Sequence, residues 1–310
     1  MLGTPNRWCA WAVAVIALAT HALAIASDPA AHQPFPRIAT SASISLQGPT
    51  TETLSVRGQV SFDAAGRGPG NQMLYSAPNL ATALVAVLMH GAIVDAARTA
   101  QKRQLQEAAD RVLSRYRDAP ATIRHTDLLL GVIAQQTSLN PTRRLALSGS
   151  PQGDWVIEST PVMTMVQDER ALILDNSVVV YDANSPKAER FEGVVRVIAS
   201  PLRRPGDAGD HWNADEGRRL RNTVGKLYAH SFEVLLAHTA RTDDAVVADR
   251  TLRYHEGSNE KFERGKLLWQ NCGRAVFKNL HGWIMSVPLA RRAGDPEHAS
   301  NCVDPLSVED

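Results

Sequence analysis

The sequence predicts an α+β protein in which helices cover one side of an antiparallel sheet. Helical periodicity occupies much of residues 80–136, whereas short β-rich runs separated by turn residues fill the segment from Trp155 to Ala199. A further helical stretch and a closing pair of strands come after them. Helices and strands that are grouped along a chain, instead of alternating regularly, are typical of the α+β class.

The first 26 residues predict a cleavable secretory signal peptide. Arg7 precedes an apolar run from Trp8 to Ile25, and Ala24 and Ala26 frame a small-x-small cleavage site directly before Ser27. Acidic and proline residues follow the run, where a retained anchor would have a basic flank. We therefore expect an exported protein, periplasmic or secreted, that is soluble after cleavage.

The charge balance disfavours two kinds of partner. The full chain has 33 basic and 32 acidic residues, and removal of the signal peptide takes away one basic residue, which leaves the mature chain neutral. A neutral chain has no overall electrostatic attraction for nucleic acid or for an anionic membrane surface. We expect no nucleic-acid partner, and membrane association is not favoured.

The mature chain is expected to divide into a flexible leader over residues 27–71 and a single α+β domain over residues 72–310. The leader is rich in Ala, Ser, Thr and Pro, and only residues 44–46 and 54–60 have the composition of short strands. Glycine and proline crowd together in residues 65–71, which predicts a linker.

A long N-terminal amphipathic helix is expected over residues 80–116. Residues 80–97 are apolar on almost all sides, which predicts a segment packed beneath other elements. The alternative is that residues 80–97 insert into a membrane or a partner. His90 and Asp95 interrupt the apolar run and leave it short of a membrane span.

Two further helices and the strands of the sheet follow. Helices are expected over residues 122–136 and from Asn213 to Thr239, where Asn213 and Glu216 resemble a capping box. Consecutive short strands separated by tight turns predict an antiparallel meander, followed by a C-terminal strand pair. The expected meander strands are residues 155–160, 162–166, 171–174, 178–181 and 194–199, and the pair is 266–271 with 275–287.

Two cysteines remain after Cys9 leaves with the signal peptide. Cys272 and Cys302 make an even number in an oxidising compartment, so we expect a disulfide that ties the C-terminal tail to the last β segment. The alternative is a pair of unpaired thiols. The spacing of these cysteines matches no metal-binding or redox motif.

No catalytic, cofactor-binding or metal-ligating residue is assigned. His230, Glu233 and His238 lie on the third helix, but at about 100° per residue they cannot converge on one ion. His238 falls at the centre of the apolar stripe and is expected in the core or at an interface. The G-x-S-x-G motif is absent, and the glycine-rich residues 66–70 contain a proline that removes an amide donor from any phosphate loop.

The remaining interpretation is a non-enzymatic binding or accessory module whose partner is another envelope protein. One alternative is a periplasmic or secreted hydrolase whose catalytic residues converge only in three dimensions. Another is a membrane-associated assembly protein that uses residues 80–97. No cofactor is expected. The candidate partner-binding residues are His90, Asp95, Arg98, Lys102 and Arg103.

Overall fold

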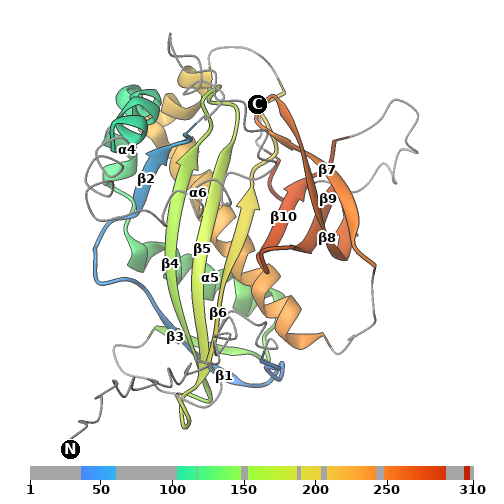
Figure 1. The fold of residues 1–310 in the computed structure, drawn as a ribbon. Helices are drawn as coiled ribbons and strands as arrows, with labels where there is room; N and C mark the ends of the chain where they lie inside the picture. The colour runs from blue at the N-terminus through green and yellow to red at the C-terminus, as the bar shows by residue number, and fades with distance from the viewer. Residues whose placement is uncertain are drawn as a thin grey trace, which may run out of the picture. The chain divides into compact units, whose positions relative to one another are not determined.

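A computed structural model describes residues 36–60, 103–116, 118–147, 153–186, 190–203, 208–241, 248–290 and 304–307 (Figure 1). These residues belong to one compact unit, Pro34–Asp310. The described strands form a single ten-stranded sheet, and helices pack against it, which confirms the α+β class.

The centre of the sheet is an antiparallel meander, as the sequence predicts. It consists of β4 (Trp155–Met165), β5 (Leu172–Asp182) and β6 (Arg190–Ile198). Each of these strands is longer than expected, because Pro161 and the Asp175–Asn176 pair lie within strands instead of ending them. The four strands expected between residues 155 and 181 are therefore two.

Pro161 is tolerated because of its place along the edge of β4. Two short strands from the predicted leader, β1 (Ser43–Gln47) and β2 (Ser55–Gly58), pair with β4 one after the other along this edge. β1 pairs as far as Glu158 and β2 begins at Val162, so Pro161 lies between the two paired stretches. A residue without an N–H is found in a sheet only where it removes no ladder bond.

The prediction of a purely antiparallel sheet is wrong, since the sheet is mixed. β1 and β2 run parallel to β4, β3 (Arg144–Leu147) runs parallel to β1, and β10 (Ile284–Pro288) runs parallel to β6. Parallel neighbours require long crossover connections. The helical segments between β2 and β3, and between β6 and the C-terminal strands, provide such connections.

The C-terminal end forms four strands, whereas the sequence predicts two. β7 (Arg250–Glu256), β8 (Asn259–Asn271), β9 (Arg274–Asn279) and β10 pair in antiparallel order. β7 and the first half of β8 are rich in charged residues, and the first half of β8 is exposed, so their sequences lack the apolar run that identifies a strand. A second apolar core, which includes Leu252, Tyr254 and Phe277, joins these strands to Ile173 and Ile198.

Helices α5 (His125–Leu139) and α6 (Ala208–Ala240) lie on one face of the sheet, behind β4, β5 and β6 in Figure 1. They correspond to the second and third helices expected from the sequence. The long helix is α6, in the C-terminal half, and not an N-terminal helix as predicted. Residues 80–102 lie outside the described residues, while residues 103–109 are helical and continue into the 3₁₀ helix η1 (Asp110–Tyr116) and the short α4 (Asp118–Ala121).

Helix α6 is broken near its start. It begins at Ala208, earlier than the expected cap at Asn213, and four residues from Ala214 to Gly217 leave helical geometry. Gly217 has φ 76°, a left-handed conformation that suits glycine. The guanidinium of Arg221 donates to the carbonyl of Glu216 at 2.8 Å, which satisfies an acceptor that the break frees.

A buried polar bridge fixes α6 to the central strands. The Ser159 hydroxyl donates to Oδ1 of Asn176 at 2.6 Å, and Nδ2 of Asn176 donates to the Ser231 hydroxyl of α6 at 3.0 Å. The hydroxyl of Tyr228 lies 2.9 Å from that of Ser159. All four side chains are buried, so each one depends on the others for hydrogen bonds that water would otherwise supply.

Removing the centre of this bridge is expected to destabilise the fold. Asn176→Ala leaves the hydroxyls of Ser159 and Ser231 with fewer partners, which should lower the free energy of unfolding by about 1 to 3 kcal/mol. Ser177→Ala, one residue further on the exposed face, should change it by less than about 0.5 kcal/mol. Urea unfolding curves of the two variants test this, and equal losses would contradict the structural role of the bridge.

Candidate functional site

The face of β4, β5 and β6 opposite α5 and α6 is uncovered by any described helix (Figure 1). Thr160 and Ser177 are paired across β4 and β5 on this face, and both are exposed. Three half-buried valines surround them, one from each strand: Val162, Val179 and Val194. We refer to these five residues as the open face.

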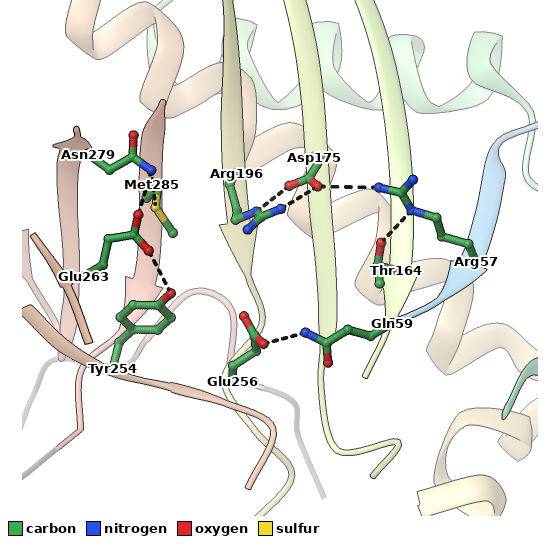
Figure 2. Close-up of polar contacts among 10 residues, drawn as sticks. All are labelled: Arg57, Gln59, Thr164, Asp175, Arg196, Tyr254, Glu256, Glu263, Asn279 and Met285. Atoms are coloured by element: carbon green, nitrogen blue, oxygen red, sulfur yellow. Dashed lines mark hydrogen bonds and ion pairs between the residues drawn. The ribbon is translucent and has the colours of Figure 1, made fainter. Parts of the chain in front are cut away.

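One end of the open face is bordered by an ion-pair cluster (Figure 2). Asp175 of β5 accepts two bonds from Arg196 of β6, Nε to Oδ1 at 2.6 Å and Nη2 to Oδ2 at 2.8 Å. Nη2 of Arg57 from β2 lies 3.9 Å from the same carboxylate, and its Nε donates to the Thr164 hydroxyl at 3.4 Å. The nearby Glu256 carboxylate is paired with Lys261 at 3.9 Å, so three cations and two carboxylates leave this end with one net positive charge.

Arg196 is held in a fixed position by its surroundings. Burial alone would lower its pKa, but the bidentate bond with Asp175 and the nearby Glu256 carboxylate together raise the pKa above its ordinary value. The guanidinium also lies over the ring of Trp283, 4.8 Å from the ring centre. Arg57 is the more accessible partner, since 47% of its side chain is exposed.

A second polar group connects the open-face side of the sheet with the β7–β8 hairpin. The Gln59 amide donates to the buried carboxylate of Glu256, as Figure 2 shows. Ser258 lies in the turn of this hairpin. Its backbone N–H and its hydroxyl both donate to the carboxylate of Asp168, which lies between β4 and β5. These contacts hold the hairpin beside the ion-pair cluster.

Further along the same strands, Glu263 accepts from Asn279 Nδ2 at 2.8 Å and lies 3.5 Å from the Tyr254 hydroxyl (Figure 2). Burial, followed by the carboxylates of Glu263 and Glu256, raises the pKa of Tyr254. The phenol therefore stays protonated and donates. The polar groups in this part of the sheet are matched to one another, which gives a rigid surface.

The other end of the open face is bordered by acidic residues. The Tyr181 hydroxyl donates to Glu158 at 3.0 Å, and Nε of Arg190 donates to Glu192 at 2.8 Å. Two carboxylates and one guanidinium leave one net negative charge at this end. The open face thus runs from a positive end at Arg57 to a negative end, a polarity that a partner can recognise.

A serine, a histidine and a glutamate also meet, on the side of the sheet that α6 covers. Nδ1 of His230 lies 3.0 Å from Oε2 of Glu233, and its Nε2 lies 3.0 Å from the Ser286 hydroxyl of β10. Hydrolytic triads use this order of groups. The bond from His230 lowers the pKa of Glu233, although burial opposes the shift.

This chain of groups is closed to substrate in the structure. Ser286 is 0% exposed, and its oxygen also receives a bond from Nε of Arg274 at 3.3 Å. Arg274 in turn pairs with Asp304 at 3.2 Å and donates to the carbonyls of Ile198 and Ser286. The arrangement links α6 to β10 and to the C-terminal residues. The spacing of residues along the helix could not predict the contact between His230 and Ser286, because Ser286 on β10 is distant in sequence.

The histidines of α6 do not share a site. His230 faces Ser286, whereas His238 has Lys278 and Arg241 as its charged neighbours. Burial, together with these two positive charges, lowers the pKa of His238 from 6.5 to about 4. Within the described ranges, no three His, Cys, Asp or Glu side chains gather closely enough to hold a metal ion.

Of the candidate partner-binding residues, Arg103 alone belongs to the part of the chain that the structure describes. Arg103 is exposed and lies 3.6 Å from Glu107 one helical turn away, while His90, Asp95, Arg98 and Lys102 lie outside the described residues. The predicted disulfide stays a prediction, since Cys302 is also outside them. None of the helices that the structure describes is long and apolar enough to cross a membrane.

Comparisons with known proteins identify no relative. No protein-family model matches the chain, and neither a curated protein nor a solved structure matches it significantly.

The depressed pKa of His238 predicts acid sensitivity. The unfolded chain takes up this proton near pH 6.5 and the folded protein only near pH 4. The free energy of unfolding should therefore be highest above pH 6.5 and fall between these values, by on the order of 3 kcal/mol from this residue.

His238→Gln should flatten this part of the stability curve, measured by urea unfolding at a series of pH values. The matched control is His281→Gln, which changes an exposed histidine and should keep the slope. An unchanged slope in His238→Gln would show that other groups cause the acid sensitivity.

Proposed function

We propose that the protein is an exported envelope protein that binds another envelope protein and has no catalytic role. The observation that carries this proposal is the open face, a row of exposed hydroxyls and half-buried valines on a rigid sheet. Residues exposed in this way on a sheet are suited to contact with a second surface. Export rests on the signal-peptide pattern of residues 1–26.

The charges at the two ends of the open face support a specific partner over general adhesion. The positive end at Arg57 and the negative end at Glu158 and Glu192 would align only with a partner of opposite order. Most of these side chains are already held by neighbours, so binding would order few of them. A pre-ordered surface loses less conformational entropy on binding.

A disulfide between Cys272 and Cys302 is the second expected consequence of export. Arg274 and Asp304 are in contact, and each lies two positions after a cysteine, Cys272 and Cys302 respectively. This contact holds Asp304 beside β9, next to the strand end that carries Cys272, which supports the predicted bridge. An exported protein would be oxidised at such a site.

The binding proposal is tested with a photo-crosslinking amino acid placed at Ser177 in the tagged, full-length protein. We expect an adduct with one envelope protein, and we expect Val179→Asp in the same chain to abolish it by placing a charge in the contact. The control site is Thr137, which is exposed on α5. Equal adducts from both sites, or none from Ser177, would contradict binding through the open face.

The same purified protein tests export. A mature chain that begins at Ser27, found in the soluble envelope fraction with both thiols blocked, is the expected result. A chain that keeps residues 1–26 would contradict export. A mature chain that needs detergent for extraction would favour the alternative of a membrane-associated assembly through residues 80–97.

A hydrolase is the second candidate, because His230 joins Ser286 and Glu233 in the order that hydrolysis requires. The burial of Ser286 argues against it. A fluorophosphonate probe, which labels accessible activated serines, should therefore leave the folded protein unlabelled. Labelling that disappears in Ser286→Ala but persists in Ser307→Ala would favour the hydrolase instead.

A further inference from the structure

A pocket of about 580 Å³ lies between the end of β1 and the start of α5. Its walls are the loop from Gly48 to Glu52 and the first turns of α5, with Leu147 of β3 beside them. Small-molecule sites have volumes of roughly 300 to 1,000 Å³. The pocket shares no residue with the open face, so a ligand bound in it would be independent of the proposed function.

His125 lines this pocket and is 95% buried, with a relative exposure of 5%. Its backbone N–H donates to the carbonyl of Glu52 at 3.1 Å, which holds the loop against the helix. Its ring interacts with the backbone of Thr53, yet Nδ1 has no hydrogen-bond partner among the described residues. A buried acceptor left without a partner is destabilising, so a donor from a ligand would be favoured at this nitrogen.

The charge state of the pocket narrows the class of ligand. Burial lowers the pKa of His125, with the Thr53 contact opposing the shift, so the imidazole is neutral at neutral pH. The carboxylate of Glu52 at the rim is paired with the Arg124 guanidinium at 3.1 Å. The described lining residues therefore include no cation that would bind an anionic ligand. They also include no unpaired carboxylate that would bind a cationic ligand.

The remaining lining groups suit hydroxyls. Thr50, Thr51 and Thr126 contribute side-chain hydroxyls, which both donate and accept hydrogen bonds. Leu129 and Leu147 contribute apolar surface, of the kind against which the carbon face of a sugar ring can pack. Acceptors and donors around a partly apolar wall match a compact molecule with many hydroxyl groups.

We propose that this pocket binds a neutral, hydroxyl-rich small molecule of mono- or disaccharide size, with a ligand hydroxyl donating to Nδ1 of His125. Binding requires a small movement of the loop from Gly48 to Glu52, because Nδ1 is fully buried in the structure. The hydroxyl of Thr126 and the free lone pairs of Glu52 hold the neighbouring hydroxyls of the same molecule.

The test is NMR of the mature protein labelled with ¹⁵N in its histidines. D-glucose, N-acetyl-D-glucosamine and maltose serve as neutral probes, and D-glucosamine and D-glucuronate as charged ones. We expect at least one neutral sugar to shift the Nδ1 resonance of His125 saturably, in the direction of a newly accepted hydrogen bond. Saturable binding of a charged probe alone, or of no probe, would overturn the proposal.

Variants inside and outside the pocket show whether the sugar binds there. Thr126→Val should weaken it about tenfold, whereas Thr137→Val, on the same helix but outside the pocket, should leave it unchanged. His125→Phe should abolish it while keeping a ring in the pocket wall. If His125→Phe fails to fold, the two threonine variants decide the matter, and equal affinities in them would refute the site.

Discussion

The neighbouring residues Asp175 and Asn176 in the middle of β5 constrain the rest of the structure. Successive side chains of a strand point to opposite faces, so these two polar groups enter different environments. Asn176 is fully buried and bonds to Ser159 and Ser231, while Asp175 faces the other way and binds Arg196. A shift of one residue in the pairing would bury the charge of Asp175 beneath α6, so the two residues fix the register.

This constraint gives the two faces of the central strands different environments. On the covered face, apolar side chains and the Asn176 bridge hold α6 in place, and a further buried chain from His230 to Asp304 anchors the C-terminal residues. On the open face, the ion pairs of Asp175 lie at the border of a surface with exposed hydroxyls. Both faces contribute to stability, since on the open-face side the second apolar core at Ile173 and Ile198 holds the β7–β8 hairpin.

Several elements could be predicted because their sequences carry a strong local pattern. The apolar stripes of α5 and α6 and the β-branched runs of the meander are of this kind. The prediction fails where polar residues lie within a strand instead of ending it. Asp175 and Asn176 have the composition of a turn, and only partners from α6 and β6 make them acceptable within a strand.

The candidate sites also depend on contacts between distant segments and not on local sequence patterns. Arg57, Asp175 and Arg196 come from three strands, and His230 meets Ser286 across 56 residues, so no spacing rule could bring either set together. The pocket at His125 depends on a loop that returns to the start of a helix far along the chain. By itself, the sequence determined the α+β class, the meander and two helices, since these follow from local periodicity. The parallel edge strands, the four-stranded C-terminal end and every candidate site were decided only by the tertiary structure, because they depend on which distant segments satisfy each other's polar groups.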